Sequence, residues 1–60
     1  MNFLLYEMIG NGVRQAKTVD EKIKYLIGWR RRLGNSGEEA IINKINSTLT
    51  ELYEIKHKGL

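Results

Sequence analysis

Two helix-start patterns divide the chain, and they constrain its fold more than any other feature of the sequence. In Thr18-Val19-Asp20-Glu21, the Thr18 hydroxyl can accept from the Glu21 amide, while the Glu21 carboxylate reaches back to the Thr18 amide. Ser36-Gly37-Glu38-Glu39 has the same form, with Glu39 in the equivalent position. Because proline is absent, nothing prevents long helices from following. The chain is therefore predicted to be all-α.

The expected ends of both helices carry basic residues and a glycine. Arg30, Arg31 and Arg32 lie where the helix dipole favours positive charge, and Gly34 is expected to stop the helix in a left-handed conformation. These signals predict one helix over about 18–34 and a second over about 36–58, which ends before Gly59. Since the connection between them is short, we expect an antiparallel αα-hairpin.

The N-terminal segment is predicted to be a third helix, over about 2–17. Its apolar residues repeat at helical spacing and form one stripe: Leu5, Met8, Ile9, Gly12, Val13 and Ala16. The two glycines together cost about 2 kcal/mol of helix propensity, so this helix could be kinked or broken at 10–12. A glycine on the stripe would also let another helix approach closely.

The length of the chain limits its stability. Sixty residues form a single helical domain, 1–60, which buries only about 60% of its unfolded surface. Cysteine is absent and His57 is the only histidine, so we expect no disulfide, no metal site and no cofactor. Unusually good helix packing and association remain as sources of stability. Association is the favoured one, and we expect a symmetric homodimer in a small helical bundle. The residues expected to form the dimer contact or internal packing are Ile45, Leu49, Leu52, Tyr53 and Ile55.

The most apolar run, residues 1–9, is not expected to be a signal peptide or a membrane anchor. No basic residue precedes it, and it falls short of the roughly 18 apolar residues of a spanning helix. The absence of cysteine fits a reducing compartment. We therefore expect a cytoplasmic protein.

An aromatic and basic strip on helix 18–34 is the feature that most suggests function. Tyr25 and Trp29 are four residues apart, so they share one side of the helix. Aromatic and arginine side chains are enriched among the residues that dominate binding energy at protein interfaces. The candidate partner-binding residues are Lys22, Tyr25, Trp29, Arg30 and Arg32. Two other interpretations stay open: Trp29 covers the core beneath the N-terminal helix, or the strip contacts a phosphate backbone.

Arg30 requires its own explanation, because it falls near the centre of the apolar face of helix 18–34. An unpaired buried guanidinium would be very costly. One interpretation is that the side chain extends off the end of the core, toward Glu38 or Glu39. The other is that the face is partly open and Arg30 reaches an acidic group on a partner.

Three functions remain compatible with the sequence, none of them enzymatic. The favoured hypothesis is a small regulatory or inhibitory protein that binds another protein, of a size typical of phage or mobile-element products directed at a host protein. The second is a basic DNA-binding or nucleoid-associated helical dimer, for which the net charge of +3 is suitable. Against it, Arg30, Arg31 and Arg32 point in three directions, about 100° apart. The third is a structural subunit that only assembles.

Overall fold

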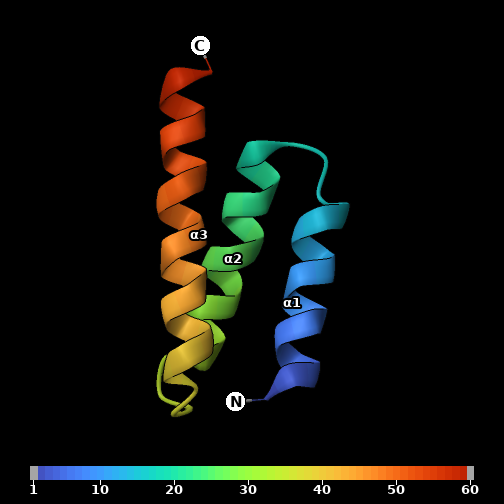
Figure 1. Ribbon diagram of the computed structural model, residues 1–60, viewed down its shortest axis with the longest axis vertical. Helices are drawn as coiled ribbons and strands as arrows, with labels where there is room; N and C mark the ends of the chain where they lie inside the picture. Colours follow the sequence, from blue (N-terminus) through green and yellow to red (C-terminus); the bar gives the residue numbers. More distant parts are fainter. Residues whose placement is uncertain (1, 60) are drawn as a thin grey trace.

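The computed structural model describes residues 2–59, and it confirms that this part of the chain is all-helical. The helices are α1 (Phe3–Gln15), α2 (Val19–Leu33) and α3 (Glu39–Lys58). Figure 1 shows α2 between the other two, running opposite to both, and α3 extending beyond the start of α2. The molecule measures 36 × 19 × 15 Å, so its long dimension is set mainly by α3.

Helix α1 is continuous, and the break considered at 10–12 does not occur. Its first turn is capped by Asn2, whose Oδ1 accepts from the amide of Leu5 at 3.1 Å. Gly12 lies where α1 meets α2. A Cβ at this position would overlap the ring of Tyr25. The close approach that glycine was expected to permit is therefore present. Packing against α2 offsets the low helix propensity of the two glycines.

Helix α2 begins as its capping pattern predicts, with one change of partner. The Thr18 hydroxyl accepts from the Glu21 amide at 3.1 Å. The Glu21 carboxylate accepts from the amide of Lys17 at 3.0 Å, and not from that of Thr18 as expected. The backbone is extended at Ala16, where α1 ends. The residue just before the cap therefore presents its amide to the first turn of α2.

The connection between α2 and α3 differs from the prediction in two ways. Gly34 is right-handed, with φ −50°, and Gly37 instead adopts the positive φ, at 81°. The Ser36 hydroxyl does not cap α3: it donates to the carbonyl of Leu33 at 2.8 Å and accepts from the amide of Glu38 at 3.2 Å. Because Ser36 is occupied in closing the end of α2, α3 begins at Glu39, later than expected.

The core is aliphatic and draws mainly on α2 and α3. The buried residues are Ile9, Ile23, Leu26, Leu33, Ile41, Ile45, Leu49 and Leu52. Burial of each such side chain contributes about 1.5–3 kcal/mol. Helix α1 supplies only Ile9 to this set, and Met8, which was expected in its apolar stripe, is 50% exposed. The α1 helix is therefore the least firmly anchored of the three.

Candidate partner-binding surface

Three of the candidate residues form a continuous row along one side of α2. The rings of Tyr25 and Trp29 meet edge to face, with centroids 6.4 Å apart and an interplanar angle of 73°. The Arg32 guanidinium carbon lies 5.5 Å from the Trp29 ring centroid, in cation–π range. The spacing of four and then three residues places all three side chains on one side of the helix.

Both aromatic rings are half-buried, so one part of each ring contacts the core and the rest is exposed to solvent. Tyr25 and Trp29 pack against the core cluster with part of their surface. Their remaining surface, with Lys24, Gly28 and Arg32, lines a hollow of about 200 Å³. The space beside Gly28 is open, since a Cβ there would meet nothing within 4 Å. Trp29 therefore covers part of the core with one side of its ring and lines the hollow with the other.

A second hollow continues this surface onto α1, and Tyr25 belongs to both. It is lined by Leu4, Glu7, Met8, Asn11, Gly12, Gln15 and Tyr25. Leu4 is 79% exposed and Met8 is 50% exposed. We call the surface formed by Leu4, Met8, Tyr25, Trp29 and Arg32 the α1–α2 face. It combines flexible aliphatic side chains, rigid aromatic rings and a cation, which is a composition typical of protein interfaces.

Lys22 does not extend its charge onto this face. Its ammonium donates to the carbonyl oxygens of Val13 at 2.5 Å and Ala16 at 2.8 Å. These carbonyls belong to the last turn of α1 and to its C-cap, which is the end of a helix that attracts cations. Lys22 therefore joins α2 to the end of α1.

Arg30 is also separated from the α1–α2 face. Its side chain is exposed, and Nη1 donates to Oδ1 of Asn46 on α3 at 3.1 Å. The guanidinium does leave the apolar face, but its partner is neither Glu38 nor Glu39. Residue 46 lies about two turns into α3, so Arg30 reaches sideways to the neighbouring helix instead of off the end of the core.

The residues expected to form a dimer contact or internal packing divide into two groups. Ile45, Leu49 and Leu52 are buried within the chain's own core, at 2%, 2% and 8% exposure. Tyr53 and Ile55 are exposed, at 40% and 53%. At 100° per residue, these two lie about 160° apart on α3 and cannot share a single contact surface.

Sequence reasoning did not select Leu4, and it placed Met8 only on the apolar stripe of the N-terminal helix. A signal for both was present, because the apolar residues of α1 occupy more of its circumference than one neighbouring helix can cover. Which of them is exposed depends on the rotation of α1 about its axis. In the observed rotation, Gly12 faces the ring of Tyr25.

Residues 2–59 contain no group of three His, Cys, Asp or Glu residues placed to hold a metal ion. None of the helices in this part of the chain has both the length and the apolarity needed to cross a bilayer. Comparison of the chain with family models, curated proteins and solved structures finds no match.

Proposed function

We propose that the chain is a small, non-enzymatic regulatory or inhibitory protein that acts by binding another protein through the α1–α2 face. It acts as a homodimer, and its target is a host protein, as for a phage or mobile-element product. The target presents an apolar surface bordered by carboxylates. The apolar part covers Leu4 and Met8, and the carboxylates pair with Arg32 and Lys24.

The continuity of the α1–α2 face is the observation that carries this proposal. The two hollows share Tyr25, so apolar, aromatic and cationic groups of two helices lie on one connected surface, which also carries Glu7, Asn11 and Gln15. Large side chains as exposed as Leu4 and Met8 are common singly on soluble proteins, but contiguous ones mark interaction sites. The aromatic row is held by its contact with the core, so its binding costs little conformational entropy.

The positions of the cations favour a protein target over nucleic acid. Lys22 is engaged with backbone carbonyls, Arg30 with Asn46, and Lys56 with Asp20 at 2.9 Å. Binding to a phosphate backbone requires several Lys or Arg side chains on one surface that are not already engaged within the chain. The α1–α2 face offers mainly apolar and aromatic groups instead.

The proposal is tested by affinity isolation from a lysate of the host cell, with quantitative mass spectrometry. The variant L4S/M8S removes exposed apolar groups from the face and is expected to stay folded. The matched control is Tyr53→Ser, which removes an exposed aromatic from α3. We expect one protein to be retained by the wild type and the control and lost with L4S/M8S. Equal capture by all three would contradict the proposal.

Binding of nucleic acid by the same variants is recognised by its dependence on salt concentration. Binding of duplex DNA through several Lys and Arg residues would weaken by about 10³–10⁵-fold between 50 and 200 mM salt. Such a dependence, unaffected by L4S/M8S, would support the DNA-binding alternative. Binding to a protein through the α1–α2 face is expected to change far less with salt, because its centre is apolar.

A further inference from the structure

A groove lies on the other side of α1, between α1 and α3. Its floor includes buried Ile9, Leu26 and Ile45, one from each helix. Its rims carry two cations, Arg14 on α1 and Lys44 on α3. The remaining lining residues are Tyr6, Gly10, Val13 and Thr48. Among residues 2–59, no carboxylate lines the groove, so it is an apolar depression with a basic border.

The volume of the groove indicates what kind of group it suits. At about 230 Å³ it is smaller than the roughly 300–1,000 Å³ typical of small-molecule pockets. Room of this size accommodates side chains from another helix. A suitable helix would bring apolar groups for the floor and carboxylates for the basic border.

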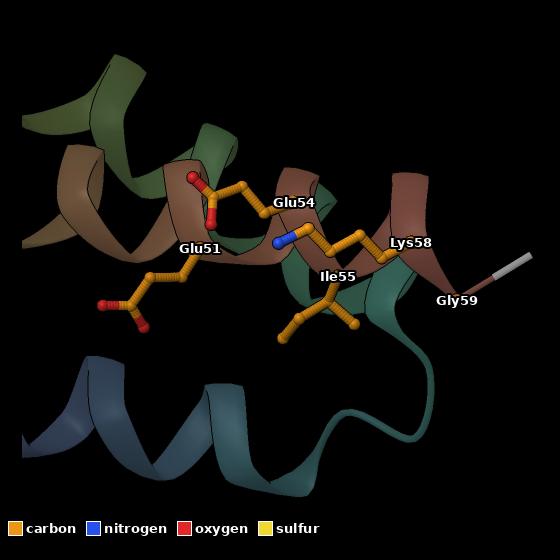
Figure 2. A pocket seen from close by; sticks show the side chains of 5 residues that line it. All are labelled: Glu51, Glu54, Ile55, Lys58 and Gly59. Carbon is orange, nitrogen blue, oxygen red and sulfur yellow. The ribbon is translucent and has the colours of Figure 1, made fainter.

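The C-terminal part of α3 has the complementary composition. Ile55 is 53% exposed, and Glu51, Glu54 and Lys58 surround it. Figure 2 shows Ile55 and Glu51 pointing to the same side of α3, the side on which α1 lies in this view. On this side of α3, Ile55 and Glu51 therefore offer an apolar group and a carboxylate next to each other. Both surfaces belong to the same chain, one toward each end of α3.

The exposed stripe that joins these two surfaces is self-complementary in charge. Ala40, Lys44, Ser47, Glu51 and Ile55 follow at intervals of four, three, four and four residues and share one side of α3. If two copies of α3 run antiparallel, a two-fold axis between residues 47 and 48 places Lys44 beside Glu51 of the second copy. Symmetry repeats this pair, so each dimer contains two such contacts.

The same register satisfies the packing along the stripe. The side chains at the axis, Ser47 and Thr48, are small and allow close approach of the two helices. Ile55 of each copy lies over Ala40 of the other, whose small side chain leaves room for it. The second α3 then runs along the α3 rim of the groove, where Lys44 and Thr48 lie, and brings its Glu51, not its Ile55, to the basic border.

We propose that two copies of the chain pair through this α3 stripe, antiparallel and with Lys44 of each copy beside Glu51 of the other. The inference rests on the homodimer proposed above and assigns its surface. Exposed Ile55 belongs to this contact, while Tyr53, on another side of α3, does not. The α1–α2 face lies on the opposite side of α1 from the groove, so it stays free for a different protein.

Charge reversal at the two paired positions tests the proposal. In Lys44→Glu both contacts become carboxylate against carboxylate, and in Glu51→Lys both become ammonium against ammonium. Each variant is expected to raise the dimer dissociation constant about tenfold, measured by analytical ultracentrifugation of the full chain. The control is Thr50→Glu, which adds a carboxylate to an exposed position of α3 outside the stripe and is expected to leave the dissociation constant unchanged.

Dimerisation of a mixture of the two variants tests directly whether residues 44 and 51 face each other. A heterodimer of Lys44→Glu with Glu51→Lys has opposite charges at both contacts, so an equimolar mixture is expected to dimerise like the wild type. Ile55→Ser, at an exposed position, is expected to weaken the dimer without unfolding the chain. Circular dichroism verifies that each variant is folded.

Three results would overturn the proposal. The first is a wild type that sediments as the 7.0 kDa protomer at all concentrations up to the millimolar range. The second is a dimer whose dissociation constant is unchanged by either charge reversal, which would place the contact on another face. The third is a mixture no more dimeric than its components. Because none of these variants alters the α1–α2 face, such failures are distinguishable from loss of target binding with L4S/M8S.

Discussion

The ring of Tyr25 lies directly against the backbone of Gly12, in the space that any larger residue at position 12 would need. This contact positions α1 on α2 and joins the two hollows of the α1–α2 face. Stability and the proposed binding surface thus depend on the same pair of residues.

Substitution of Gly12 by alanine is expected to destabilise the fold. The new methyl group must displace Tyr25 or lift α1 away from α2. A matched control exists in Gly28→Ala, because residue 28 is also helical but has open space beside it. Both variants gain helix propensity, so comparison cancels that term. We expect Gly12→Ala to be about 1–3 kcal/mol less stable than Gly28→Ala in urea unfolding.

A double-variant cycle tests the cause of this difference. If the Tyr25 ring is what the methyl group strikes, adding Tyr25→Ala should remove most of the penalty of Gly12→Ala. Equal stability of Gly12→Ala and Gly28→Ala would show that the contact is not tight.

Substitution of Thr18 by alanine is expected to lower the free energy of unfolding by about 1 kcal/mol, because the Glu21 amide loses its cap. Thermal unfolding followed by circular dichroism measures the effect. Thr50→Ala is the control: its hydroxyl only returns to the carbonyl of Asn46, within one helix. Alanine should be neutral or slightly stabilising there. A Thr18→Ala variant as stable as Thr50→Ala would argue against the cap.

Substitution of Lys22 by methionine should loosen α1 selectively. The carbonyls of Val13 and Ala16 lose a charged donor in a partly buried setting, at a cost of about 1–3 kcal/mol. Amide hydrogen exchange should accelerate in α1 more than in α3. In Lys24→Met, which removes an exposed lysine from the same helix, exchange should be unchanged. Uniform acceleration over all three helices would contradict a local role for Lys22.

Local sequence signals predicted most of the helical structure, but not the link between α2 and α3. The Thr18 hydroxyl has one suitable donor nearby, so its cap follows from the local pattern. The Ser36 hydroxyl has two uses, capping α3 or closing α2, and the second is adopted. The choice depends on how α3 is placed against α2, which the four residues of the capping pattern do not encode.

The candidate surface was predictable only where one helix determines it. The spacing of Tyr25, Trp29 and Arg32 was enough to predict that they share a side of α2, and the structure brings them together. The use of Lys22 and the exposure of Leu4 depend on how α1 is docked and rotated. That information lies in contacts between helices.

The most direct test of the central claim is to map the binding surface with the captured target protein. Two-dimensional NMR of the isotope-labelled chain, with and without the target, reports which backbone amides change. The account predicts the largest changes at Leu4, Met8, Tyr25, Gly28 and Arg32, with Lys44 and Glu51 unaffected. Changes concentrated on α3, with the α1–α2 face unaltered, would contradict it.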